Sequence, residues 1–369
     1  MLLDRKNEPR ETPRAPWAGV ALFDALVDRL QSVLGRHGRK LWWFHSVYAL
    51  TLGSFVVLFA QKGFERARWL AISVVLTWLL VLVFFSLFGS GATQQNMEAA
   101  GPKARIRFFV MTYVLKNLYQ SMLFFLLPFY WKSATVGAPN FYFVLLLGTC
   151  AFLSTLDIVF DRFVMKKRGY ASIFHGMALF SCINLVIPAL FPNTRTLISL
   201  LGAATITVVA FWTLHVPLRA MKRLKYLVVL SASLGSGIVA AYFGRFIVPP
   251  VPMHLSHGAV GPEQMPDGRL TMEVKQLHAS VINRMYAVTD IVIPGGEGDE
   301  LRHIWRLDGR VIHLVDNLKK TGEGPKGTVR FVSQLGEHEL PENLTGDWMV
   351  DVETADGQLV GRVSFTVIE

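Results

Sequence analysis

The chain has 369 residues, of which 52% are hydrophobic and 17% charged, a composition too apolar for an ordinary soluble protein. Its net charge of +10 divides unevenly, because residues 1–253 carry 17 more basic than acidic groups and residues 254–369 carry 7 more acidic than basic groups. The basic excess therefore lies beside the apolar segments, and the acidic C-terminal part argues against binding to nucleic acid. Both cysteines, Cys150 and Cys182, lie in apolar segments, which excludes a disulfide framework or a thiolate metal site from the C-terminal part.

Residues 1–40 predict a cytoplasmic N-terminal segment. Residues 1–16 are charged and contain prolines, and no apolar run follows the start as it would in a cleavable signal peptide. Residues 17–35 place apolar side chains at alternating spacings of three and four, which predicts an amphipathic helix. Such a helix would lie on the inner membrane surface or pack against the rest of the protein, and the sequence leaves both open.

Seven apolar runs follow, each near the roughly 20 residues that a helix needs to cross a bilayer. They predict a polytopic α-helical membrane bundle of about seven transmembrane helices over residues 41–248. Residues 1–40 and the loops on the same side of the membrane hold 19 basic residues, and the loops on the opposite side hold 5. The positive-inside rule therefore predicts a cytoplasmic N-terminus. With an odd number of spans, the C-terminal part is expected on the other side of a bacterial inner membrane, in the periplasm. The predicted spans are 41–60, 69–91, 107–131, 141–164, 173–192, 197–216 and 227–248.

The C-terminal part has a different pattern. Residues 249–268 contain closely spaced prolines, which end the last helix and predict a linker. Residues 269–369 alternate apolar and polar side chains between turn-rich segments, which predicts an all-β, immunoglobulin-like antiparallel sandwich. The strands are expected at 270–276, 281–293, 303–307, 310–315, 328–334, 348–354 and 359–368.

The stretch ELRHIWRLDGRVIHLVD, residues 300–316, predicts a β-hairpin around an Asp-Gly turn. In a regular hairpin with this two-residue turn, His303 pairs with Leu314 and His313 pairs with Ile304. The two histidines would then point to opposite faces and could not bind one metal ion without a bulge or a third element. The exposed face would be a candidate ligand or partner surface made of Ile304, Arg306, Val311 and His313.

Two stretches, HIWRLDGRVIHLV and GDWMVDVETADGQLVGRVSFTV, resemble a small C-terminal domain of proteobacterial membrane proteins, the domain of unknown function numbered twenty-nine fourteen. Residues 318–345 depart from the basic, aromatic middle strand of that family. The resemblance implies a membrane-attached domain and brings no established activity or site residue. Trp305 and Trp348 are expected to be core residues of the sandwich. The positions that match the family pattern are His303, Trp305, Gly309, Gly346, Trp348, Val350, Val352, Phe365 and Val367.

Ionisable residues inside the apolar runs are costly, and each is therefore a functional candidate. Lys116 and Asp157 lie at similar depths in neighbouring predicted helices, which predicts an ion pair between them. The pair would be a structural cross-link or part of a polar cavity for an ion, a proton or a lipid head group. The other polar members of this cluster are Asn117, Gln120 and Asp161.

The last predicted span carries Ser233, Gly237 and Ala241 at a spacing of four, which permits close helix approach within the bundle or between protomers. No P-loop, HExxH motif, GxSxG motif or catalytic carboxylate pair is found, which favours a protein that is not an enzyme and predicts no cofactor or metal.

Three readings of the function remain. In the first, the bundle is a non-catalytic anchor in the lipid bilayer whose periplasmic sandwich binds an envelope protein or glycan. In the second, the protein is a transporter or lipid-handling protein with a polar cavity around Lys116 and Asp157, although no inverted repeat supports it. In the third, it is a sensor that passes periplasmic binding to helix 17–35.

Overall fold

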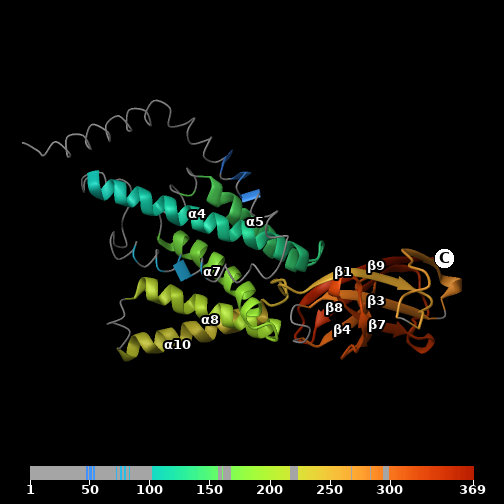
Figure 1. Ribbon diagram of the computed structural model, residues 1–369. Helices are drawn as coiled ribbons and strands as arrows, with labels where there is room; N and C mark the ends of the chain where they lie inside the picture. Colours follow the sequence, from blue (N-terminus) through green and yellow to red (C-terminus); the bar gives the residue numbers. More distant parts are fainter. Residues whose placement is uncertain are drawn as a thin grey trace, which may run out of the picture. The chain divides into compact units, whose positions relative to one another are not determined.

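The computed structural model describes five helices followed by two β-sheets (Figure 1). The chain divides into a unit Met1–Tyr48 and a unit Ala49–Glu369, and all the elements below belong to the second unit. The predicted segment 1–40 with its helix 17–35, and most of the predicted spans 41–60 and 69–91, lie outside the described residues. The described residues are 47–48, 50–51, 53–54, 72, 75–76, 79, 83, 102–156, 160, 168–216, 223–266, 268–282, 284–293 and 299–369.

The five helices follow the last five predicted apolar runs. Three segments are long and apolar enough to cross a membrane, namely Gly169–Leu190, Thr196–Thr213 and Leu224–Phe243, which indicates a membrane protein. The expectation of seven spanning helices is therefore not supported in number within the described part of the chain. The helices are α4 (Pro102–Ser133), α5 (Asn140–Thr155), α7 (Arg168–Leu190), α8 (Thr196–His215) and α10 (Leu224–Phe243).

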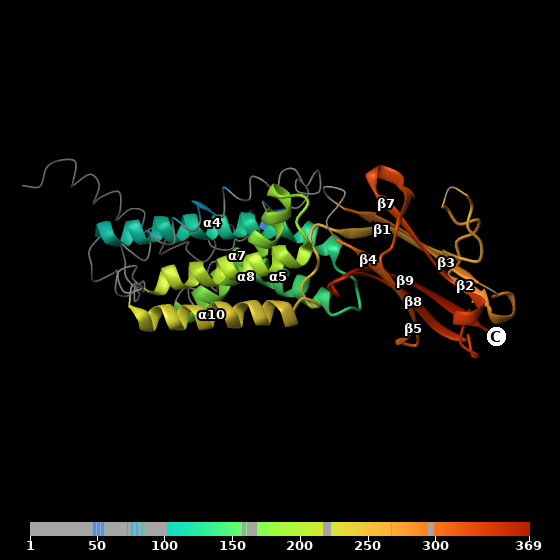
Figure 2. The ribbon, with the colours of Figure 1, turned by 90° about the horizontal axis from the view of Figure 1, so that it is seen from below.

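The helices pack as neighbouring pairs. Helices α4 and α5, α4 and α7, α7 and α8, and α8 and α10 are in contact (Figure 2). Leu123, Leu147, Leu185 and Leu200 are fully buried in this packing, as leucine-rich helix faces require. Among the described residues, α10 buries no side chain of its own, so it is a peripheral helix.

The small-residue stripe of α10 packs within the bundle. A Cβ atom on Gly237 would lie 2.8 Å from Cγ2 of Val208 on α8, a distance that side chains do not tolerate. Glycine at this position therefore lets α8 and α10 approach each other closely. Ser233 donates its hydroxyl hydrogen to the Val229 carbonyl of its own helix. Gly237, at the centre of the stripe, thus serves the α8–α10 contact.

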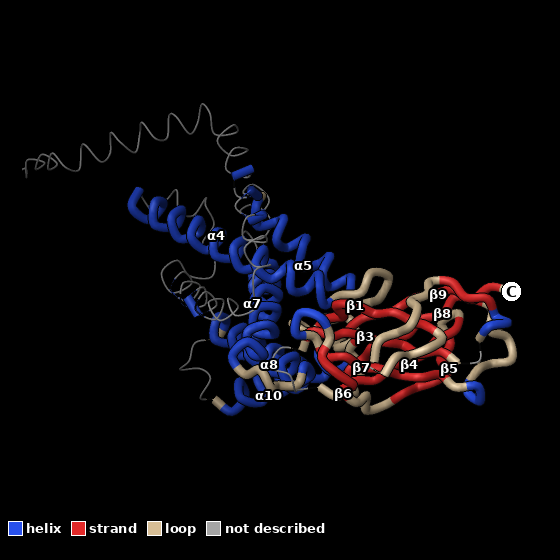
Figure 3. The backbone as a smooth tube through the Cα atoms, turned by 45° about the vertical axis from the view of Figure 1, so that its right-hand side comes forward, coloured by secondary structure: helices blue, strands red, loops and turns tan. Residues whose placement is uncertain are grey.

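The C-terminal part forms two sheets (Figure 3), which confirms the all-β expectation. One sheet has the order β1-β3-β7-β6 and the other has the order β2-β9-β8-β4-β5. Strands β2 and β9 are parallel, so the expectation of a purely antiparallel sandwich was wrong at this edge. The strands are β1 (His254–Gly261), β2 (Gln276–His278), β3 (Met285–Val292), β4 (Leu301–Leu307), β5 (Arg310–Val315), β6 (Lys320–Glu323), β7 (Val329–Leu335), β8 (Gly346–Thr354) and β9 (Leu359–Ile368).

Strand β1 corrects the predicted linker 249–268, because it occupies residues 254–261 and pairs with β3. The sequence HLSHGAVG alternates weakly, and its two glycines, Gly258 and Gly261, lower β propensity. The structure needs glycine at residue 258, since a Cβ atom on Gly258 would lie 2.4 Å from Cγ2 of Val363. The polar, glycine-containing strand β6 was missed for the same reason, and β2 lies at 276–278 rather than 270–276.

The core between the sheets draws on both ends of the domain. Trp305 and Trp348 are fully buried, and the Phe365 ring stacks on Trp348 at 5.9 Å between centroids. Val260 from β1 and Met285 from β3 belong to the same apolar cluster. Strands β4 to β9 therefore do not contain the whole core of the sandwich.

This shared core predicts how fragments of the domain behave. A fragment 299–369 lacks β1 and β3 and exposes the apolar surface that they cover, so it should not unfold cooperatively. A fragment 253–369 retains all nine strands and should show one cooperative thermal transition by near-ultraviolet circular dichroism, which reports tryptophan packing. A cooperative transition of the shorter fragment would contradict the shared core.

Candidate functional site

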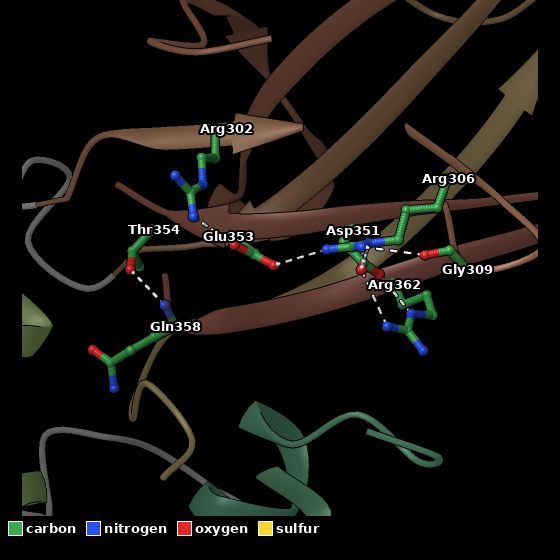
Figure 4. A network of polar contacts seen from close by, with 8 residues as sticks. All are labelled: Arg302, Arg306, Gly309, Asp351, Glu353, Thr354, Gln358 and Arg362. Carbon is green, nitrogen blue, oxygen red and sulfur yellow. Dashed lines mark hydrogen bonds and ion pairs between the residues drawn. The ribbon is translucent and has the colours of Figure 1, made fainter. Parts of the chain in front are cut away.

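Five charged side chains on the outer face of the five-stranded sheet are joined by hydrogen bonds and ion pairs (Figure 4). Arg302 donates to Glu353 over 2.8 Å, and Arg306 donates to Asp351 over 2.9 Å. Arg362 donates from two nitrogens to the two carboxylate oxygens of Asp351. These residues, which come from β4, β8 and β9, are called the charged ladder below.

Asp351 is the centre of the charged ladder, because it accepts hydrogen bonds from two arginines. Its side chain is only 2% exposed, whereas those of Arg306 and Arg362 are about a quarter exposed, at 25% and 24%. Breaking a buried ion pair leaves the remaining charge uncompensated, which costs more than the intact pair contributes. Asp351 therefore fixes the positions of both guanidinium groups.

The predicted partner surface is only partly exposed. Ile304 is 5% exposed, so its assignment to an exposed face was wrong. It lies beside Asp351 in the sheet, among arginines whose long aliphatic stems can cover apolar surface. Arg306 is held by Asp351, and Val311 is 55% exposed. Of the four residues, Val311 is the one that is freely accessible.

The hairpin of β4 and β5 has the expected turn, with positive φ at Asp308 and Gly309, but a different register. A bulge between Trp305 and Arg306 makes Trp305 pair with His313, and His303 with Val315. A bulge inserts one residue in one strand and shifts every later pair. His313 therefore shares the face of Trp305 and His303, and the prediction of opposite faces was wrong.

The two histidines nevertheless have different partners. His313 Nε2 lies 3.3 Å from the carboxylate of Glu339 and is partly exposed. His303 is fully buried between the sheets, with Nε2 at 2.9 Å from the Thr289 hydroxyl and Nδ1 at 2.7 Å from the Ser333 hydroxyl. No group of three metal-ligating side chains occurs among the described residues.

His303 ties the two sheets together, because it lies on β4 while Thr289 and Ser333 lie on β3 and β7. Trp305 adds a third connection by donating its indole N–H to the Ser333 hydroxyl over 3.1 Å. Burial lowers the pKa of His303 to about 3, since the charged form loses its hydration. His303 is thus a neutral, structural histidine of the core.

The depressed pKa of His303 predicts acid sensitivity. The unfolded chain takes up a proton near pH 6.5, whereas the folded protein does so only near pH 3. The stabilisation by neutral His303 is complete above pH 6.5 and decreases as the pH falls toward 3, by about 2 kcal/mol at pH 5. Urea unfolding of the 253–369 fragment at pH 7 and pH 5 should show this loss in the wild type and in His313→Gln. In His303→Gln the loss should be smaller by about 2 kcal/mol, and the remainder comes from His254, whose pKa is also lowered by burial. Equal losses in all three proteins would refute the assignment.

The other sheet contains an ion pair that the sequence reading missed. Arg330 on β7 donates two hydrogen bonds, over 2.8 and 2.9 Å, to the two carboxylate oxygens of Asp290 on β3. Both side chains are buried, at 8% and 1% exposure. The signal in the sequence was one ionisable residue inside each of two apolar strands, which requires a partner when buried.

Several polar side chains are buried between the helices. Lys116 and Gln120 are 5% and 3% exposed, while Asn117 donates its amide hydrogen to the Tyr113 carbonyl of its own helix. Asp157 and Asp161 lie outside the described residues, so the Lys116–Asp157 pair stays a prediction.

Two histidine contacts join these helices and were not predicted. The Tyr119 hydroxyl on α4 lies 2.6 Å from Nδ1 of His175 on α7. His215 on α8 places Nδ1 2.8 Å from the Phe211 carbonyl, which can only accept, so in the neutral imidazole Nε2 accepts from the Ser172 hydroxyl over 2.9 Å. Nε2 of His175 is buried without a hydrogen-bond partner in the described structure.

Comparison with known protein families covers both parts of the chain. Residues 21–287 match a family model described as a family of unknown function (DUF5924). The chain belongs to this family. Residues 299–367 match a second model, a protein of unknown function (DUF2914), which confirms the resemblance drawn from the hairpin and the last two strands. No curated protein matches the chain.

The two matches divide the sandwich between them. The first ends within β3, and the second begins just before β4. The sheet β1-β3-β7-β6 therefore contains strands from both family regions. In this protein, the DUF2914 region is completed by strands of the DUF5924 region.

Proposed function

We propose that this protein is a non-catalytic anchor of the bacterial inner membrane that presents a periplasmic, immunoglobulin-like binding domain. The observation that carries the proposal is the direct succession of apolar helices and a sandwich whose outer sheet face bears the charged ladder and exposed Val311. The partner is an envelope protein or glycan.

The charge distribution supports the orientation. The flanks assigned to the cytoplasmic side carry the large excess of basic residues, and the sandwich is acidic. Seven spans, with the N-terminus in the cytoplasm, satisfy this distribution. Charged side chains and the exposed, apolar Val311, which pairs with Arg306, lie on the outer face of the sheet. This face is suited to a partner that offers both polar and apolar groups.

Site-specific labelling and cross-linking in a Gram-negative host test the proposal. The native Cys150 and Cys182 are buried, so introduced cysteines can be labelled selectively. An impermeant maleimide should label Asn317→Cys once the outer membrane is permeabilised, and Lys222→Cys only after the inner membrane is disrupted. A photo-cross-linker at Val311 should capture an envelope component, whereas one at Met272, on the loop beside β1, should not. Reversed labelling or equal capture at both positions would count against the proposal.

A second function, transport or lipid handling, is favoured by the buried polar groups of the helices. Lys116 and Gln120 are buried, and Nε2 of His175 lacks a partner within the described structure. Buried polar groups of this kind are costly in a membrane and are retained where they bind or relay something. The polar cavity of this second proposal would include Asp157.

The cavity requires that Lys116 and Asp157 interact. Replacing Lys116 by Met or Asp157 by Asn should each lower the unfolding midpoint in detergent, because each leaves an uncompensated charge. The double variant should be more stable than the sum of the single effects by about 1 kcal/mol or more. Additive effects would show that the two residues do not interact.

A further inference from the structure

The sandwich supplies the N-terminal cap of a membrane helix. The first backbone N–H of α8, on Thr196, donates to the Asp299 carboxylate, with distances of 3.0 and 3.3 Å to its two oxygens. The residue before this helix, Arg195, provides no side-chain cap, and the first turn contains no acidic residue. A carboxylate at a helix N-terminus satisfies a free N–H group and the positive end of the helix dipole. Asp299 therefore completes α8 from a position 103 residues further along the chain.

The surroundings of Asp299 are charged on both sides. Arg195 pairs with Glu300 over 3.5 Å, and Asp356 contributes a second negative charge nearby. Burial raises the pKa of Asp299, while the hydrogen bonds from Thr196 and the charge of Arg195 act in the opposite direction. The carboxylate is thus partly removed from water by its contact with the helix.

The turn between β8 and β9 contacts two further helix ends. Asn140, the first residue of α5, donates its amide hydrogen to the Leu359 carbonyl over 3.0 Å. Arg245, just after α10, donates to the Asp356 carbonyl, and Gln358 donates to the Val248 carbonyl over 3.3 Å. Asn140 and Gln358 are each 1% exposed. The contacts of Asn140 and Gln358 are therefore shielded from solvent, whereas Arg245 is partly exposed.

The segment that leaves α10 is packed on both sides. Val248 and Val251 belong to the apolar cluster of the helices, whereas Met253 belongs to an apolar cluster of the sandwich. Arg245 is held by the Tyr242 carbonyl over 2.6 Å and lies over the Tyr242 ring. The segment that was expected to be a spacer is an ordered connection.

The charged ladder leads to the same turn. Glu353, which binds Arg302, precedes Thr354, and the Thr354 hydroxyl accepts a hydrogen bond from the backbone N–H of Gln358 (Figure 4). At the other end of the ladder, Arg306 contacts the Gly309 carbonyl of the β4–β5 turn at 3.5 Å. Arg306 also lies 3.9 Å from Glu353, so polar contacts extend across the sheet from the β4–β5 turn to Glu353. The backbone from Glu353 to Thr354 connects them to the turn that touches the helices.

We propose that Asp299 and the β8–β9 turn couple the charged ladder to the ends of α5, α8 and α10. A ligand that rearranges the ladder would then change the packing of these helix ends. The binding domain would act as a sensor that passes ligand binding to the helices. That such a ligand exists rests on the function proposed above, but the coupling between the ladder and the helix ends can be measured without a ligand.

Hydrogen exchange of the full chain in nanodiscs tests the cap. Replacing Asp299 by Ala should speed exchange of the first-turn amides of α8 by roughly 2- to 30-fold, the range expected for a lost cap. Asp299→Asn should stay near the wild type, because asparagine caps helices equally well. Asp316→Ala, an exposed acidic residue of the same domain, is the matched control and should have no effect.

The coupling is tested by changing the ladder and measuring hydrogen exchange at the helix ends. Asp351→Asn and the milder Arg306→Gln should speed exchange in β8 and β9, and also at residues 196–198 and 245–248 by roughly 3-fold or more. Near-ultraviolet circular dichroism shows that a variant has kept its tryptophan packing, and Arg306→Gln serves if Asp351→Asn does not fold. Faster exchange confined to the sandwich would overturn the coupling. If the photo-cross-linker at Val311 captured no envelope component, the proposed ligand would lose its support, but the hydrogen-exchange result on the coupling would stand.

Discussion

The pairing of β3 with β7 is the contact on which the sandwich depends, because β3 begins in the first family region and β7 lies in the second. On the inner side of this pair, Thr289 and Ser333 hold the buried His303 of the opposite sheet. On the outer side, Asp290 and Arg330 form a buried ion pair. Without this pairing, the His303 contacts and the ion pair would both lose one partner, and the core would be open on one face.

The sandwich built on this strand pair contains two kinds of polar arrangement. In the core, His303 remains neutral and uses both ring nitrogens for contacts between the sheets. On the outer face, the arginines and carboxylates remain charged and satisfy one another at the edge of solvent. The first arrangement fixes the fold, whereas the second can exchange partners with a ligand at a smaller cost, since partly exposed charges are hydrated.

The regular elements could be predicted well from the sequence. Strands β5 and β9 have the predicted bounds, and the Asp-Gly turn was predicted from its residues, because residue type sets turn conformation locally. The bulge beside Trp305 could not be, since it depends on how β4 fits between β5 and β8. Strand β1 was missed because its pairing with β3, and not its own alternation, makes it a strand.

The candidate site was harder to predict. Arg306 was singled out, but Asp351, its partner 45 residues away, could not be assigned without the sheet order. Ile304 was placed on the exposed face by strand alternation, which does not show that neighbouring arginines can cover an apolar side chain. The Asp299 cap of α8 has no signature in the helix sequence, because the capping residue lies in another domain.

The shared sheet also limits how these proteins can be rearranged in evolution. A recombination event that joined residues 299–369 to a new membrane partner would transfer β4 to β9 and leave β1, β2 and β3 behind. The transferred segment would aggregate through the uncovered edge of β7 unless the recipient supplied an equivalent of the β1–β3 pair. Productive fusion points should therefore fall before residue 254, and gene architectures that carry this domain should retain three strands upstream of it.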